Sequence, residues 1–338
     1  MHVPGHVLVT GAAGFIGAAV AEALLRRGDR VTGVDDLNPY YDPALKRARL
    51  ARLSDMRVHE IDVADDGGMD RLFAAERFDA VVHLAAQAGV RHSLENPRLY
   101  VRSNVSGFLN VLEGARDQKV RHLVYASSSS VYGDAGAGED GRPFSTADPV
   151  DHPVSLYAAT KRANELMAHS YAHLYAVPMT GLRFFTVFGP WGRPDMAPMV
   201  FLDRLLRDEP LRVFNEGRHA RDFTYVDDVV DAVLRVLDRP PVSNPNGADD
   251  RPDGGRAPAR VYNVGRGRPT ALLDFIAMLG EAAGREPRLD LVPMQPGDVE
   301  RTAADTSALE RDTGFRPRTD TREGVGRFVR WYRDFYRV

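Results

Sequence analysis

The stretch His6-Val7-Leu8-Val9-Thr10-Gly11-Ala12-Ala13-Gly14-Phe15-Ile16-Gly17 decides the fold of this chain. A short β-prone run leads into a glycine-rich turn, and a helical pattern follows over residues 18–27 until Gly28 ends it. Glycines allow the backbone to approach a pyrophosphate, which rests on the positive end of the helix. The segment therefore predicts a strand, a glycine turn and a helix that bind a dinucleotide.

An acid follows at the spacing that such a site requires. The second predicted strand, Arg30–Asp35, ends in Asp35, which lies 18 residues after Gly17. A carboxylate near this position reaches the adenosine ribose. Because it also repels a 2′-phosphate, the sequence favours NAD over NADP.

Further β-prone runs alternate with helical segments along the first half of the chain. They cover residues 57–61, 78–86, 122–126 and 179–184. This alternation predicts an α/β fold with a doubly wound parallel (Rossmann) sheet and the ligand across the carboxyl ends of its strands. We expect residues 1–180 to form the NAD-binding domain. Residues 181–338 should form a smaller α+β region that binds the substrate and returns some strands to the first sheet.

Two strand ends suit the two ends of a dinucleotide. Asp62 and Val63 follow the third predicted strand and are placed for the adenine. The fourth runs into Leu84-Ala85-Ala86, where small side chains would let a dinucleotide lie flat over the sheet edge.

Composition excludes several classes of protein. The 338 residues are 43% hydrophobic and 27% charged, as in a soluble globule with a sizeable core. A net charge of −3 gives no basic field for nucleic acid, and the absence of cysteine rules out disulfides and thiolate chemistry. The ten histidines show no ligand clustering, so no metal site is expected. No apolar run approaches the roughly 20 residues that span a bilayer, and the start lacks a signal-peptide pattern. We expect a cytoplasmic protein with neither nucleic-acid nor membrane partners.

A serine run and a tyrosine–lysine pair carry the chemistry. Ser127-Ser128-Ser129-Ser130 closes a predicted buried strand, and Tyr157 and Lys161 follow at i and i+4 on one helix face. Of 44 basic residues only Lys46, Lys119 and Lys161 are lysine, although arginine would serve for a surface charge. A tyrosine beside an ammonium and a serine hydroxyl can move a proton on and off a sugar or alcohol oxygen. Taken alone, a serine-rich turn and a surface pair explain the same residues.

Longer segments resemble a known family over nearly the whole chain. TGAAGFIG at 10–17, HLAA at 83–86, SSSSVYG at 127–133, YAATK at 157–161 and RDFTYVDD at 221–228 resemble the extended short-chain dehydrogenase/reductase family of nucleotide-sugar enzymes. Within it, VDDLNPYYD at 34–42, AAQAGVRHSLENP at 85–97, LRFFTVFGPWGRPDMAP at 182–198 and PMQPGDVERTAADTS at 293–307 are similar to UDP-glucuronate 4-epimerases.

The resemblance implies an activity and a cofactor. UDP-glucuronate would be epimerised at C4 to UDP-galacturonate through a 4-keto intermediate, with the hydride stored transiently on tightly bound NAD. Tyr157 would be the base, Lys161 would lower its pKa and hold the nicotinamide ribose, and Ser128 would contact the C4 oxygen. The implied cofactor-binding residues are Gly11, Gly14, Phe15, Ile16, Gly17, Asp35, Asn38, Asp62, Val63, Leu84, Ala85, Ala86, Tyr157 and Lys161.

The choice of nucleotide sugar depends on a few side chains. Related 4,6-dehydratases carry an Asp-Glu pair where this chain has Ser129 and Ser130. Decarboxylases typically carry Glu and Asn at the positions of Ser130 and Thr186. Neutral hydroxyls suit a substrate carboxylate, whereas an acid would repel it. The implied substrate-binding residues are Arg91, Ser128, Ser129, Ser130, Thr186, Arg193, Arg212, Val213, Phe214, Arg221, Asp298 and Arg301.

Alternatives remain at this point. A UDP-glucose/galactose 4-epimerase or a UDP-glucuronate decarboxylase would share the first step, and a non-catalytic NAD-binding scaffold is a more distant alternative. The resemblance also implies a homodimer that packs the helices bearing Asn104 and Tyr157 against the partner. Residues 239–260 read as a turn-rich, mobile insertion and residues 324–336 as a closing helix.

Overall fold

A parallel sheet organises the chain. The computed structural model describes residues 5–133, 141–243, 256–294 and 299–338. In these residues seven strands pair in the order β11-β6-β5-β4-β1-β2-β3, and every pair is parallel. The strands are β1 His6–Thr10, β2 Arg30–Asp35, β3 Arg57–Glu60, β4 Ala80–His83, β5 His122–Ser128, β6 Met179–Phe184 and β11 Ala259–Val264. The predicted α/β fold class is confirmed.

Helices cover both faces of this sheet, which is why its strands are apolar on both sides. Leu8 of β1 packs on one face with α3, α6 and α7, whereas Val7 and Val9 pack on the other with α1 and α9. The helices of the first half are α1 Phe15–Arg26, α2 Pro43–Leu50, α3 Asp66–Ala75, α4 Val90–Glu95, α5 Pro97–Tyr100, α6 Gly107–Gln118 and α7 Leu156–Tyr175. Successive side chains of β1 therefore belong to two different hydrophobic cores, one on each face of the sheet.

The predicted helix over residues 97–116 is interrupted by a wider turn. A π-helix, Val101–Ser106, separates α5 from α6 and contains the buried Asn104. Asn104 accepts a hydrogen bond from the Gln87 amide at 2.8 Å, and its Nδ2 donates to the Gln87 carbonyl and to Thr160 Oγ1, each at 3.0 Å. Such turns are frequent at functional sites. Here the π-helix places the side-chain amide of Asn104 between Gln87, which follows β4, and Thr160 of α7.

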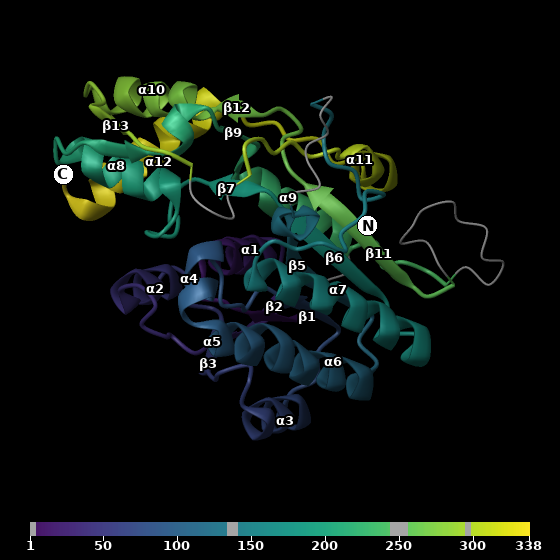
Figure 1. Cartoon of the computed structure of the whole chain (residues 1–338). Helices are drawn as coiled ribbons and strands as arrows, with labels where there is room; N and C mark the ends of the chain where they lie inside the picture. The colour runs from purple at the N-terminus through teal and green to yellow at the C-terminus, as the bar shows by residue number, and fades with distance from the viewer. Residues whose placement is uncertain (1–4, 134–140, 244–255, 295–298) are drawn as a thin grey trace.

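The second half of the chain forms small sheets and one cluster of helices. β7 Thr186–Phe188 pairs with β10 Phe223–Tyr225, β8 Leu211–Val213 with β13 Leu289–Leu291, and β9 Ala220–Arg221 with β12 Thr270–Ala271. The remaining helices are α8 Ala197–Leu206, α9 Val226–Leu237, α10 Leu272–Ala283, α11 Ser307–Thr313 and α12 Thr321–Tyr336. Figure 1 shows α8, α10 and α12 grouped at the top and α3 and α6 at the bottom.

Three expectations concern this half. β11 pairs with β6 in the main sheet, while the division into two domains at residue 180 stays a prediction. The predicted closing helix begins earlier, at Thr321, because the Asp320 side chain accepts a hydrogen bond from the Arg322 amide at 2.9 Å. Much of the predicted insertion, residues 244–255, lies outside the described residues. Among the described helices, none combines the length and the apolar character needed to cross a membrane.

Candidate active site

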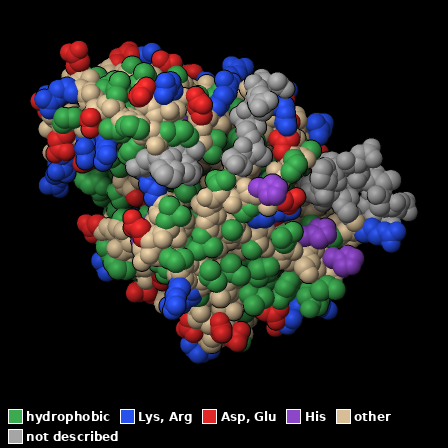
Figure 2. Space-filling view, in the orientation of Figure 1, with side chains coloured by type: hydrophobic (Ala, Val, Ile, Leu, Met, Phe, Trp, Pro, Cys, Tyr) green, Lys and Arg blue, Asp and Glu red, His purple; other side chains and the backbone are tan. Residues whose placement is uncertain are grey.

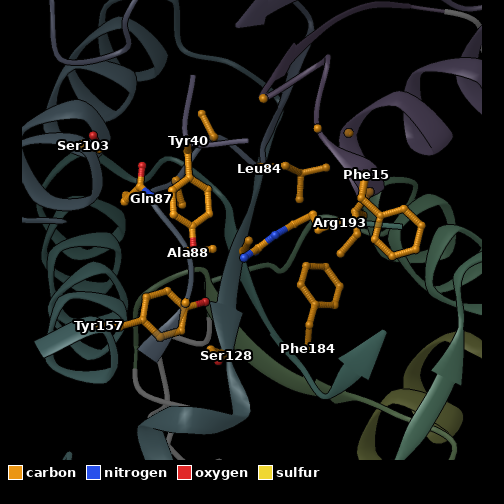
Figure 3. A pocket seen from close by; sticks show the side chains of 18 of the residues that line it. Phe15, Tyr40, Leu84, Gln87, Ala88, Ser103, Ser128, Tyr157, Phe184 and Arg193 are labelled. Carbon is orange, nitrogen blue, oxygen red and sulfur yellow. The ribbon is translucent and has the colours of Figure 1, made fainter. Parts of the chain in front are cut away.

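A cavity of about 360 Å³ lies at the carboxyl ends of the central strands (Figure 3). All the predicted cofactor-binding residues line it: Gly11, Gly14, Phe15, Ile16, Gly17, Asp35, Asn38, Asp62, Val63, Leu84, Ala85, Ala86, Tyr157 and Lys161. Five of the predicted substrate residues do so as well: Ser128, Ser129, Ser130, Thr186 and Arg193. The fold therefore brings the serine run, the tyrosine–lysine pair and the glycine turn to one hollow.

The glycine turn has the geometry of a dinucleotide cradle. Gly11 has a φ of +68°, and a Cβ on Gly17 would lie 2.0 Å from the Gly11 carbonyl oxygen. Helix α1 begins beyond Gly14 with no side-chain cap and no acid in its first turn, so its positive end offers backbone amides to the cavity. Asp35 stands beside this turn, where its Oδ2 accepts a hydrogen bond from the Ala13 amide at 3.0 Å. The amides of the turn would suit a pyrophosphate and the Asp35 carboxylate a ribose hydroxyl, so these residues fit a dinucleotide such as NAD.

Local signals in the sequence position the tyrosine and the lysine. Ser155 Oγ accepts a hydrogen bond from the Ala158 amide at 3.1 Å and so starts α7, which places Tyr157 and Lys161 in its first two turns. The Lys161 ammonium donates to the Ala126 carbonyl of β5 at 2.9 Å. Ser128, at the end of the same strand, lies close enough to the Tyr157 hydroxyl to lower the pKa of Tyr157. Figure 3 shows the side chains of Tyr157, Ser128 and Arg193 converging in the cavity.

A cation that the sequence did not assign to this role, Arg193, acts on Tyr157. Burial raises the pKa of Tyr157, while the Ser128 hydrogen bond and the positive charge of Arg193 act in the opposite direction. The predicted cation, Lys161, donates to the Ala126 carbonyl, and its effect on the pKa of Tyr157 stays a prediction. Arg193, which the resemblance assigns to the substrate, therefore also favours the phenolate.

Burial sets the protonation of two groups behind the tyrosine. It lowers the pKa of Lys161 to about 8. It also lowers the pKa of His83 to about 3, helped by the charge of Lys161. The neutral His83 bonds Thr10 Oγ1 at 2.8 Å and stacks on Phe108. His83 is therefore a buried, uncharged side chain that packs against Phe108 and does not act as a general acid.

The lowered pKa of Lys161 predicts a titration near pH 8. As the pH rises through this value the ammonium loses its charge in the folded chain, while the unfolded chain keeps the proton up to its ordinary value of 10.5. The unfolded state binds more protons in this interval, so the free energy of unfolding should increase with pH there. The sequence contains three lysines, so ¹³C-lysine labelling of nucleotide-stripped protein gives three assignable sets of signals. A midpoint above pH 10 for Lys161 would contradict the prediction.

Arg193 is held by two neighbours that the sequence did not indicate. Its Nε donates to Asp195 Oδ1 at 3.0 Å, and the Tyr40 hydroxyl donates to Asp195 Oδ2 at 3.1 Å. Burial and Asp195 raise the pKa of Tyr40 to about 12, so its hydroxyl keeps its proton. The guanidinium therefore lines the cavity while it is held in an ion pair with Asp195.

Two basic residues of α2 also escaped the sequence interpretation. Arg49 is fully buried and donates to the Ala13 and Trp191 carbonyls at 2.9 and 2.7 Å, so it joins the glycine turn to the segment that carries Arg193. Lys46 lines the cavity beside Asp35. The rarity of lysine, which singled out Lys161, was a signal for Lys46 as well. For Arg49 no local pattern existed, because the carbonyls that it binds lie far away in the chain.

The other predicted substrate residues that the structure describes lie outside the cavity lining. Phe214 has the guanidinium of Arg91 4.8 Å from its ring centroid and that of Arg212 at 5.3 Å, while Val213 is buried. Arg221 donates to the Glu300 carbonyl at 2.9 Å, next to Arg301 on the adjoining segment. Asp298 lies outside the described residues. The structure thus assembles two further groups, and their roles stay predictions.

Comparison with known proteins identifies the family. Residues 7–265 match the NAD dependent epimerase/dehydratase family, and the chain belongs to this family. It is 46% identical over 336 residues to a probable UDP-glucuronate 4-epimerase of Rhizobium meliloti (strain 1021), covering 98% of this chain and 97% of the relative. The sequence-based expectation of the family is confirmed.

Solved structures agree with this assignment. A UDP-glucuronic acid 4-epimerase from Bacillus cereus, in complex with UDP-glucuronic acid and NAD, superposes with a TM-score of 0.84 at 29% identity and covers 98% of this chain and all of the other. A UDP-glucose 4-epimerase from Thermotoga maritima, with UDP-glucose, gives a TM-score of 0.82 at 29% identity and covers 98% of this chain and 99% of the other.

Proposed function

We propose that this protein interconverts UDP-glucuronate and UDP-galacturonate by NAD-dependent epimerisation at C4. The observation that carries the proposal is the cavity wall beside Tyr157, where the hydroxyls of Ser129, Ser130 and Thr186 stand with the guanidinium of Arg193. Neutral donors and an arginine suit a sugar carboxylate, because no acid among them repels it. The likeness to named UDP-glucuronate 4-epimerases over almost the whole chain supports the same substrate.

Each catalytic side chain has a separate task in this proposal. Tyr157 takes the proton of the C4 hydroxyl and later returns it, while Ser128 bonds the C4 oxygen. NAD, when bound, supplies the acceptor for the C4 hydride. Lys161 uses one N–H on the Ala126 carbonyl and has two more for the ribose hydroxyls of the cofactor. Arg193 favours the phenolate electrostatically and receives the substrate carboxylate, with Asp195 moving aside.

The nucleotide end of the substrate would lie at the two groups outside the cavity lining. Phe214, with Arg91 and Arg212 against its ring, offers an aromatic face and cations for a uracil and its neighbouring phosphate. Arg221 and Arg301, on adjoining segments, offer two more cations for the pyrophosphate. Val213 and Asp298 complete the predicted contacts.

An incubation with two substrates tests the function. Purified protein is mixed with UDP-glucuronate and, separately, with UDP-glucose, and the products are followed by proton NMR. We expect UDP-galacturonate from the first and slow or no conversion of the second. Conversion of UDP-glucose alone would favour a UDP-glucose 4-epimerase, and a UDP-pentose as the main product would favour a decarboxylase. A protein that converts neither sugar would be a non-catalytic NAD-binding scaffold.

Removing a hydroxyl beside the carboxylate should cause a side reaction. The 4-keto form of UDP-glucuronate is a β-keto acid and loses CO₂ when its carboxylate bond aligns with the carbonyl π system. We infer that Thr186 and Ser130 hold this bond out of alignment. Thr186→Ala and Ser130→Ala should therefore release UDP-pentose, measured by NMR beside the epimer. The matched control is Ser170→Ala, an exposed hydroxyl on α7. Equal product purity in all three variants would refute the inference.

We also propose that two copies pair through α6 and α7. Leu109 on α6 and Leu166 and Leu174 on α7 are 40%, 56% and 64% exposed. Figure 2 shows hydrophobic side chains gathered over these helices. Burying such a patch against a second copy removes apolar surface from water. Leu166→Glu should sediment as a monomer, whereas Leu289→Glu on β13 should not change the dimer. The cytoplasmic location expected from the sequence stays a prediction.

A further inference from the structure

A buried ammonium stands beside the acid that selects the cofactor. Lys46, on α2, is 5% exposed and lines the cavity together with Asp35 and Asp36. Its Nζ lies 3.4 Å from Asp35 Oδ1 and 3.8 Å from Asp36 Oδ1, and 5.5 Å from the centroid of the Tyr41 ring. Any group that Asp35 accepts at the cavity wall is therefore close to this ammonium.

Asp35 cannot turn away from Lys46, because backbone amides fix its carboxylate. Oδ2 accepts from the Ala13 amide at 3.0 Å and Oδ1 from the Leu37 amide at 2.9 Å. A carboxylate has about four acceptor positions, and the two amides and the Lys46 ammonium use three, so one ribose hydroxyl still finds room. The pairing has an energetic reason, since a buried ammonium without an opposite charge is strongly destabilising.

The charges around this carboxylate balance only while it is ionised. The Arg49 guanidinium lies near enough to interact with the charge of Asp35, which helps to hold up the pKa of Arg49 against burial. Asp36 is more exposed, and both its carboxylate oxygens are engaged by the Asn38 side-chain amide. Two cations thus face two carboxylates. Neutralising Asp35 leaves one net positive charge at the ribose end of the cavity, in a buried place where charge is weakly screened.

We propose that Lys46 is a cofactor-specificity residue, a phosphate-binding cation that Asp35 masks. The inference rests on the proposed function, because it takes Asp35 as the acid at the adenosine ribose. NAD is then preferred for two reasons, namely that Asp35 repels a 2′-phosphate and that it neutralises the ammonium that would bind one. With Asp35 neutral, the same pocket accepts the 2′-phosphate of NADP on the Lys46 ammonium.

A four-variant comparison tests this. Wild type, Asp35→Asn, Lys46→Met and the double variant are purified, and the nucleotide released on denaturation is separated by chromatography to give the NADP to NAD ratio. Dissociation constants for NAD and NADP are then measured by calorimetry on stripped protein. In Asp35→Asn we expect the preference for NAD over NADP to fall by about 100-fold, as the loss of one buried charge partner implies. The double variant should lose the NADP affinity that Asp35→Asn gains. Lys46→Met alone should still prefer NAD.

Two results would overturn the proposal. One is equal NADP affinity in Asp35→Asn and in the double variant, and the other is no gain of NADP in Asp35→Asn over wild type. Asp35→Ser is the second variant in case the asparagine protein does not fold, because a hydroxyl can still accept one of the backbone amides. The readout is nucleotide content and affinity, so a protein that retains NAD but leaves UDP-glucuronate unchanged would refute the proposed function without touching this inference.

Discussion

Tyr157→Phe should lower kcat for UDP-glucuronate epimerisation by about 10²–10⁴-fold, the usual contribution of a positioned acid–base group. The substitution removes the hydroxyl that lies near Ser128 and leaves a ring of the same shape, edge-on to Tyr100 at 6.1 Å. Packing should therefore survive, and the variant should still retain NAD. The measurement is initial rate by NMR or coupled chromatography, together with the nucleotide content of the purified protein.

A matched control lies on the same helix. Tyr171 also presents its hydroxyl from α7, but to Glu113 of α6, and neither residue lines the cavity. Tyr171→Phe should keep the wild-type rate. If Tyr157→Phe loses less than about tenfold, the proton is taken by another group and the assigned role of Tyr157 is wrong.

Arg183→Met should lower the free energy of unfolding by about 3–5 kcal/mol, the usual cost of breaking a buried ion pair. Arg183 of β6 donates to Glu165 of α7 from Nε at 2.8 Å and from Nη2 at 2.9 Å, and both side chains are buried. Burial alone would raise the pKa of Glu165, but Arg183 holds it below its usual range, so the carboxylate is charged at neutral pH. Without Arg183 this charge loses its main partner.

The pair also supports the catalytic residues. Glu165 lies one turn after Lys161 on α7, and its Oε1 accepts a hydrogen bond from Ser127 Oγ at 2.6 Å, next to Ser128. The loss of Arg183 should therefore lower kcat as well as stability.

A double-mutant cycle separates the pair from general damage. Glu165→Gln should restore part of the stability lost in Arg183→Met, because it removes the uncompensated carboxylate. The control is Arg207→Met, which breaks an exposed pair with Asp203 on α8 and should cost less than about 1 kcal/mol. Urea denaturation at pH 7 gives the free energy of unfolding of the wild type, of each single variant and of the double variant. Similar losses of unfolding free energy in Arg183→Met and Arg207→Met would contradict the prediction, because the buried pair would then stabilise the fold no more than the exposed one.

Local patterns predicted much of the fold and of the cofactor site. The glycine turn and Asp35 were readable because each depends on short spacings between a strand end and the next element. The interruption at Asn104 was not, since a π-helix looks like an ordinary helix in the pattern of apolar residues. The sequence predicted the position of Lys161 relative to Tyr157 only in part. Their i, i+4 spacing is local, but the carbonyl that holds the ammonium belongs to β5.

The sequence by itself determined the strand–turn–helix at the glycines, the parallel sheet, and the serine and tyrosine–lysine groups, because these follow from periodicities of two to four residues. Only the tertiary structure decided which charges meet. The charge of Arg193 acts on Tyr157, and Lys46 lies against Asp35. Arg49 joins the glycine turn to Trp191, which lies 142 positions after Arg49 in the chain. Such contacts depend on the order of the strands and on where each crossover returns, and no local spacing encodes them.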